Sequence, residues 1–182
     1  MQINVSQLLK ASIGSMRSYK VNETMNVTDN GSDSVVQGEV NLIRTDRGIL
    51  ANGIFRTEVE ITCSRCLRPF SCPLTLNFEE EYFPTVNIIT GVPLSLPDEP
   101  GCFTIDEHHT LDLTEAIRQY ALLAIPMKPI CMANCAGLCP NCGQNLNQGP
   151  CKCPPQEADP RWSKLRELSL TSDDTSVNDI GK

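Results

Sequence analysis

The chain has 182 residues, ten of them cysteine, and a formal net charge of −7. This length suffices for one domain of ordinary size with a small appendage. The negative charge argues against indiscriminate binding to nucleic acid, and no apolar run reaches the length of a signal-peptide core or of a bilayer-spanning segment. We therefore expect a cytoplasmic protein that does not act at a membrane.

The first half of the chain has the pattern of an antiparallel β meander. Gly53 separates two of its β-rich runs, and a turn with Cys63 and Cys66 precedes the last one. Apolar residues alternate in that last run, which places Cys72 in the core, and Pro73 indicates an edge strand or a bulge. The predicted strands cover residues 35–42, 49–55, 57–62 and 70–78.

A proline-rich acidic loop at residues 84–101 precedes one amphipathic helix over residues 112–124. Asp112 is the predicted N-cap, with Glu115 three residues later, and Pro126 follows the helix as a stop signal. An apolar stripe repeats along it at helical spacing. The expected fold class is therefore α+β, an antiparallel β meander or barrel-like sheet with one main helix.

The rest of the chain divides into a cysteine-rich module and a polar tail. After the β-rich core domain of residues 1–130, residues 131–170 hold a small zinc-ribbon module, too poor in apolar residues to fold without a metal, and a short C-terminal helix. Asp159 and Pro160 mark the start of that helix. Residues 171–182 are polar, and we expect them to be disordered.

Eight of the ten cysteines form four closely spaced pairs. In a reducing compartment such pairs favour metal binding over disulfides, because a tight turn aims two thiolates at one tetrahedral ion. Two pairs complete one site, so the sequence predicts two structural Zn²⁺ ions. The expected ligands are Cys63, Cys66, Cys131, Cys135, Cys139, Cys142, Cys151 and Cys153.

The grouping of these pairs follows from their reach along the chain. Numbered in chain order, the third and fourth pairs are close enough to form a self-contained site. The first and second pairs would then tie the sheet to the module. The sequence also allows the second pair to join the third and the first to join the fourth.

The string Cys63-Ser-Arg-Cys66 also has the spacing of a redox dithiol. Such a dithiol needs a helix N-terminus to lower the pKa of its first thiol, whereas a strand pattern follows Cys66. The sequence shows no nucleophile beside a base and no phosphate-binding glycine loop, and closed four-cysteine sites leave no coordination position for a substrate. We therefore expect no enzymatic activity and no small-molecule substrate.

Three motifs occur in order along the chain: Cys63-Ser-Arg-Cys66-Leu67 with Phe70, then residues 137–147 ending in Cys151-Lys152-Cys153, and last Asp159-Pro160-Arg161-Trp162. Together they resemble the bacterial YceD family, whose members are called large ribosomal RNA subunit accumulation proteins. The resemblance extends over nearly the whole chain, from the N-terminal strand to Leu170.

The resemblance implies a cytoplasmic bacterial protein, or an organellar relative, that promotes accumulation of 23S rRNA and so maturation of the large ribosomal subunit. It implies no settled chemistry. The alternative is an RNA-processing enzyme, or an accessory subunit, that acts on precursor rRNA. The expected partner is the assembling large subunit, through a ribosomal protein, the 23S rRNA or both.

Charge along the chain is uneven. Residues 79–115 carry nine acidic side chains and no Lys or Arg, a composition that repels an rRNA backbone and attracts a basic ribosomal protein. Cations lie instead near the cysteine turns and in the last helix, where scattered solubilising charge is the alternative interpretation. Trp162 is either a partner anchor or a packing residue. The predicted partner contacts are Arg65, Arg68, Lys152, Arg161 and Trp162.

Overall fold

A computed structural model describes residues 1–28, 33–97, 101–154 and 161 of the chain. The chain forms two compact units, Met1–Gly137 and Leu138–Lys182. The boundary expected at residue 130 thus falls inside the first unit, which keeps Cys131 and Cys135. None of the helices in the described part of the chain has the length and apolarity needed to span a bilayer.

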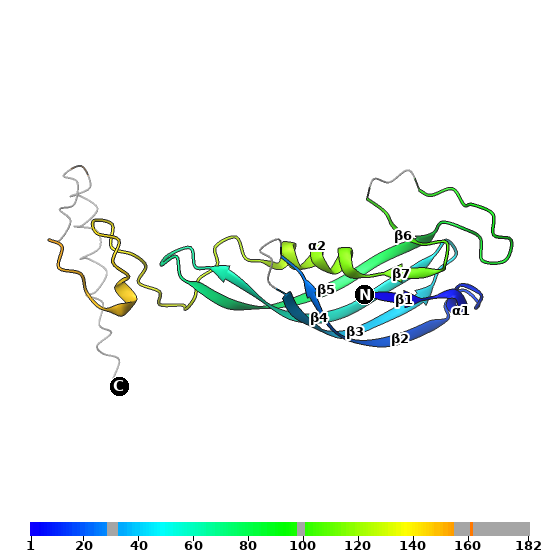
Figure 1. Ribbon diagram of the computed structural model, residues 1–182, viewed down its shortest axis with the longest axis horizontal. Coiled ribbons are helices and arrows are strands. Elements are labelled where there is room, and N and C mark those ends of the chain that lie inside the picture. Colours follow the sequence, from blue (N-terminus) through cyan, green and yellow to red (C-terminus); the bar gives the residue numbers. More distant parts are fainter. Residues whose placement is uncertain (29–32, 98–100, 155–160, 162–182) are drawn as a thin grey trace, which may run out of the picture. The chain divides into compact units, whose positions relative to one another are not determined.

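The first unit is built on one seven-stranded sheet (Figure 1). Its strands lie in the order β1-β7-β6-β5-β4-β3-β2, and every neighbouring pair is antiparallel except β5 and β6. In chain order the elements are β1 (Gln2–Asn4), α1 (Ser6–Leu9), β2 (Met16–Asn26), β3 (Asp33–Arg44), β4 (Ile49–Thr62), β5 (Pro69–Pro84), β6 (Phe103–Ile105), β7 (Thr110–Asp112) and α2 (Thr114–Ala124).

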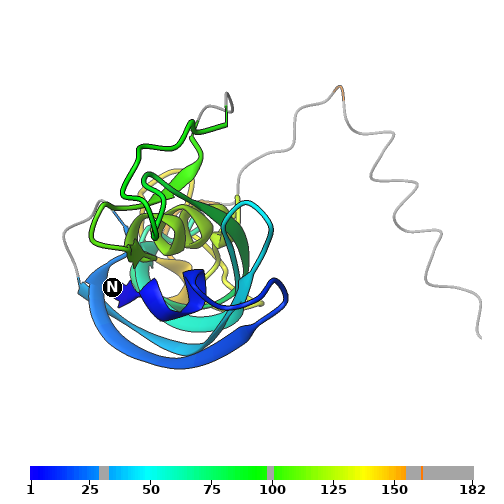
Figure 2. The ribbon, with the colours of Figure 1, turned by 90° about the vertical axis from the view of Figure 1, so that its right-hand side faces the viewer.

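The sheet curls into a half-barrel around α2 (Figure 2). Side chains alternate along β4 and β5, so that Phe55 and Leu76 are buried on the inner face. Helix α2 lies against β5, where the ring centroids of Phe78 and Tyr120 are 5.3 Å apart and the Tyr120 hydroxyl donates to the Glu79 carbonyl over 2.9 Å. The predicted β-rich fold with one main helix is confirmed at this level.

Strand β4 corrects the prediction of two strands separated at Gly53. It runs unbroken from Ile49 to Thr62. A Cβ atom on Gly53 would lie 2.2 Å from the Glu39 carbonyl oxygen, so the absence of a side chain permits β3 and β4 to approach closely. Gly53 therefore lies inside a strand, at a close approach of two backbones, and does not end a strand.

The N-terminal elements β1, α1 and β2 precede residue 35, where the first strand predicted from the residue pattern begins. Strand β2 lies at one edge of the sheet and buries only Val21 and Met25, so its apolar alternation is sparse.

Helix α2 begins at Thr114, two residues after the predicted start at residue 112, because Asp112 belongs to β7. The Asp112 carboxylate still accepts the Thr114 backbone N–H over 2.8 Å.

Two predictions on β5 have different outcomes. Pro73 lies where β5 has β4 as its single strand neighbour, which confirms the edge position. Cys72 packs against the margin of the core as predicted, but it is only half-buried, because β4 is the single described strand beside β5 at this point.

In the second unit the described residues include one short 3₁₀ helix, η1 (Leu146–Gln148). Apart from Arg161, the predicted C-terminal helix and the tail lie outside the described residues.

Candidate metal centres

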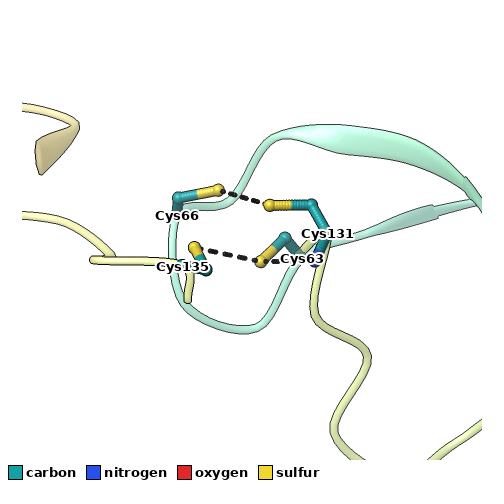
Figure 3. Close-up of side chains that lie close together, drawn as sticks. All are labelled: Cys63, Cys66, Cys131 and Cys135. Carbon is teal, nitrogen blue, oxygen red and sulfur yellow. Dashed lines mark hydrogen bonds between the residues drawn. The ribbon is translucent and has the colours of Figure 1, made fainter. Parts of the chain in front are cut away.

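Four cysteines of the first unit converge at the turn between β4 and β5 (Figure 3). Cys63 and Cys66 lie in that turn, and Cys131 and Cys135 lie in the segment after α2. Their four sulfurs are all within 4.8 Å of one another, with 3.9 Å from Cys63 to Cys135 and 3.6 Å from Cys66 to Cys131. A tetrahedral ion with Zn–S bonds of about 2.3 Å holds its sulfurs about 3.8 Å apart, whereas disulfide sulfurs are about 2.05 Å apart. The cluster therefore has the dimensions of a four-thiolate metal site.

Backbone hydrogen bonds shape this first turn. The Leu67 N–H donates to the Cys63 carbonyl over 3.0 Å, and the Cys63 N–H donates to the Arg68 carbonyl over 2.9 Å. The second half of the site is tied in by the Ser64 N–H, which donates to the Pro129 carbonyl over 2.8 Å. The four ligand candidates are thus held by contacts between segments far apart in sequence.

The Arg65 side chain contributes to the same connection. Its guanidinium Nη1 donates to the Cys135 carbonyl over 3.0 Å, so the cation crosses between the two cysteine pairs. Sequence reasoning missed this structural role and assigned Arg65 to a partner contact. No sequence signal identifies it, because the acceptor is a backbone carbonyl that only the fold brings near.

The surroundings of the first cluster favour ionisation of one thiol and disfavour another. Backbone N–H groups, that of Cys66 first, lower the pKa of Cys63 below its ordinary value. The N–H groups of Arg65 and Cys131 also point at the Cys63 sulfur, at 3.5 and 3.4 Å. Burial and hydrogen bonding to neighbouring sulfurs raise the pKa of Cys131. A bound dication would offset the mutual repulsion of four thiolates here.

The second unit contains a separate cluster of Cys139, Cys142, Cys151 and Cys153. All four sulfurs lie within 4.8 Å of one another, and the Cys151 and Cys139 sulfurs are 3.3 Å apart, too far for a disulfide bond. Backbone hydrogen bonds, that from the Cys142 N–H first, lower the pKa of Cys139. Hydrogen bonding, first with Cys142, raises the pKa of Cys153. This cluster has the composition and spacing of a second four-thiolate site.

Local turns bring the second cluster together. The Gly143 N–H donates to the Cys139 carbonyl over 2.9 Å, and the Cys139 N–H donates to the Gln144 carbonyl over 2.8 Å. Asn145 then caps η1, with its side-chain oxygen accepting the Asn147 N–H over 3.0 Å. This short helix turns the chain back toward Cys151 within one compact unit.

The structure brings the cysteine pairs together in the favoured grouping, first with second and third with fourth. Cys102, which lies outside the four closely spaced pairs, is half-buried and belongs to neither cluster. Among the predicted partner contacts, Arg65, Arg68, Lys152 and Arg161 are exposed. Arg65 and Arg68 belong to the first unit and Lys152 and Arg161 to the second, while Trp162 lies outside the described residues.

The amino-acid sequence is similar to those of several known proteins. The model of the family described as large ribosomal RNA subunit accumulation protein YceD matches residues 51–169, which include all eight clustered cysteines. An uncharacterized protein of Mycobacterium tuberculosis is 33% identical over 128 residues, which are 70% of this chain and 59% of that protein.

Two plant proteins are also similar. The large ribosomal RNA subunit accumulation protein YCED homolog 1, chloroplastic, of Arabidopsis thaliana is 28% identical over 173 residues, covering 80% of this chain and 52% of the plant protein. Its Zea mays counterpart is 27% identical over 142 residues, covering 64% and 48%. The chain thus spans about half the length of these curated relatives. No solved structure matches it.

Proposed function

Since the chain belongs to the YceD family, we propose that it is a non-catalytic factor that promotes 23S rRNA accumulation and maturation of the large ribosomal subunit. The observation that carries this proposal is the match over residues 51–169 to a family described by large ribosomal RNA subunit accumulation. The names of the two plant relatives agree with it.

We further propose that both cysteine clusters hold structural Zn²⁺. The support is the donor set, because four thiolates at tetrahedral spacing suit zinc, and the fourth thiolate fills the position that a catalytic zinc keeps open for water. The first ion would be held by Cys63, Cys66, Cys131 and Cys135, and the second by Cys139, Cys142, Cys151 and Cys153. Elemental analysis of the purified chain should give about two zinc ions per chain.

The closed donor sets also favour a factor over an enzyme. In the first centre Cys63, Cys66 and Cys135 are buried, which shields the ion from a substrate. The metals would instead rigidify the exposed turn that carries Arg68 and, in the second unit, the turn that carries Lys152. These cations, with Arg161 and Trp162, are the proposed contacts to a ribosomal protein or to rRNA.

Depletion of the protein in its native cell tests the function. The expected result is a deficit of mature 23S rRNA and of large subunits in sedimentation profiles, restored by the wild-type chain and by Cys102→Ser. Cys63→Ser combined with Cys139→Ser should fail to restore either quantity. Unchanged 23S rRNA and subunit levels on depletion would contradict the proposal.

The enzyme alternative needs its own measurement. Purified zinc-loaded protein is incubated with precursor 23S rRNA, with and without a chelator, and the RNA ends are mapped. We expect no protein-dependent cleavage in either condition. Cleavage that follows protein concentration and disappears in the Cys63→Ser and Cys139→Ser chain would replace the factor with a processing enzyme.

A further inference from the structure

Strand β4 continues for six residues beyond its pairing with β3. The β3–β4 ladder ends where Gln37 meets Arg56, whereas β4 reaches Thr62 and β3 begins at Asp33. Over residues 57–62 the single strand neighbour of β4 is β5. Figure 1 shows the ends of β4 and β5 extending beyond the β2–β3 hairpin. We call residues 57–62 and 69–74 the terminal ribbon.

The backbone of β4 directs alternate residues to opposite sides. The Cys63 N–H donates to the Arg68 carbonyl, and the register then assigns the ladder hydrogen bonds toward β5 to Thr57, Val59 and Ile61. The N–H and C=O groups of Glu58 and Glu60 therefore face away from β5. Within the described residues no strand pairs with them on that side.

The two edges of the terminal ribbon are not equivalent. Pro73 and Pro69 of β5 are the register partners of Glu58 and Thr62, so their backbone nitrogens face away from β4. Proline has no N–H to donate, so the β5 edge is blocked against a further strand at both positions. Over residues 57–62 the β4 edge contains no proline. It remains able to form a ladder.

A groove lies along this open edge. It has a volume of about 620 Å³ and is lined from three strands, with Val35 and Gln37 of β3, Glu58 and Glu60 of β4, and Leu74 of β5 among its walls. Thr57 also lines the groove. The residue is 4% exposed, and its hydroxyl oxygen is buried without a hydrogen-bond partner in the described part of the chain. A strand added along this edge would bring polar backbone groups beside that hydroxyl.

We propose that the groove binds an extended, basic segment of a partner protein, which adds as a strand to the β4 edge. This inference goes beyond the proposed function and does not depend on it. Strand addition satisfies the main-chain groups of Glu58 and Glu60. The groove wall carries the carboxylates of Asp33, Glu58 and Glu60 against one cation, Arg56, so the charge favours Lys or Arg in the segment.

The two faces of β4 define the pattern of the bound segment. Glu58 and Glu60 are exposed, so the residues opposite them should be Lys or Arg. Thr57 and Val59 are buried on the other face, so the alternate residues should be small or β-branched, with a Ser or Thr beside Thr57. The predicted ligand therefore alternates basic and β-branched residues.

Charge argues against two other occupants. An RNA backbone would be repelled by the groove carboxylates. A second copy of the chain, paired edge to edge about Val59, would place Glu58 opposite Glu60 of its partner, and like charges directly opposite destabilise a ladder.

The test uses the full zinc-loaded chain and a fluorescent synthetic peptide of about nine residues, which exceeds the roughly 20 Å length of the open edge. The peptide alternates Lys with Val or Thr. A second peptide carries N-methyl groups on the alternate backbone nitrogens that would face β4, and a third has Glu in place of Lys. We expect saturable binding of the first, and affinity at least about tenfold weaker for each of the others.

Two proline variants separate the edges. Glu60→Pro removes an N–H from the open edge without removing a ladder bond to β5, whereas Asn77→Pro removes one from the outer edge of β5, at an exposed position outside the groove lining. We expect Glu60→Pro to weaken peptide binding about tenfold and Asn77→Pro to leave it unchanged. Glu58→Lys with Glu60→Lys should abolish the preference for Lys over Glu while leaving the thermal midpoint nearly unchanged.

Several outcomes overturn the proposal: no binding of the unmodified peptide, equal binding of the N-methylated peptide, or equal loss in both proline variants. Binding of an RNA oligonucleotide that Glu60→Pro removes would also overturn it. A homodimer in sedimentation that Glu60→Pro dissociates would assign the edge to a second copy instead.

Discussion

The two cysteine turns share a backbone hydrogen bond but differ in how much buried structure surrounds them. In both, the N–H of the residue after the second cysteine donates to the carbonyl of the first, from Leu67 to Cys63 and from Gly143 to Cys139. The first turn ends a ribbon of the main sheet, and three cysteines of its cluster are buried. In the second unit, Cys139 is the single buried side chain within the described residues.

This difference assigns the two metals different roles. The first unit has a hydrophobic core that includes none of its four clustered cysteines, so a metal there is a clamp between the hairpin and the segment after α2. The second unit lacks such a core among its described residues, so its metal takes the place of one. The predictions that follow test this contrast, from the largest expected effect to the smallest.

Removal of metal should give the largest difference in stability between the two units. With a strong chelator, amide hydrogen exchange should lose protection throughout residues 138–153, because a metal-dependent module unfolds when its ion is removed. Protection in β3, β4 and β5 away from the turn should remain. Restored zinc should restore both patterns. Equal loss of protection in the two units would contradict the contrast.

Substitution of one ligand in each cluster should show the same difference between the units, with a smaller effect on the chain than removal of both metals. Cys139→Ser should leave about one zinc per chain and unfold the second unit, since a three-thiolate site holds the ion poorly. Cys63→Ser should lower the stability of the first unit by about 3 kcal/mol and leave it folded, because it opens the long loop that the metal closes.

Circular dichroism during thermal unfolding, together with zinc analysis, measures both effects. Cys102→Ser is the matched control, because Cys102 is outside both clusters, and it should keep two zinc ions with little change in midpoint. If Cys63→Ser abolished folding of the sheet, the first metal would be part of the core and not a clamp.

The two arginines of the first turn should differ in effect. The Arg65 guanidinium donates to the Cys135 carbonyl, so Arg65→Gln should cost about 1.5 kcal/mol of stability. Arg68 is exposed, and Arg68→Gln should change stability by less than about 0.5 kcal/mol. Denaturant titration measures both. Association with large-subunit particles, measured by co-sedimentation at low and high salt, should weaken in Arg68→Gln at unchanged stability.

The sequence predicted the cysteine clusters better than the strands, for a physical reason. Ligand pairs such as Cys139 and Cys142 are marked by residue type and spacing, which are local properties. Strand β2 is an exposed edge with two buried residues, and Gly53 resembles a break, so neither has a local signal of its sheet. The contact of Arg65 with Cys135 could not be predicted, because it joins residues that only the assembled fold brings together.

The last expected effect is local to each turn and concerns the residue after each second cysteine. Leu67 has φ of 56° and Gly143 has φ of 72°, so both turns require the left-handed conformation that glycine adopts most readily. Leu67→Gly should therefore stabilise the first turn by up to about 1 kcal/mol, while Gly143→Ala should destabilise the second by about 1 kcal/mol.

A Cβ atom at Gly143 would meet no atom within 4 Å, so the cost there belongs to the backbone conformation alone. Competition with a chromophoric chelator reports zinc affinity at each site, and amide exchange reports local stability. The two substitutions should shift these quantities in opposite directions. A loss in both variants would show that the Leu67 side chain, 63% exposed, contributes more to the first turn than its backbone strain removes.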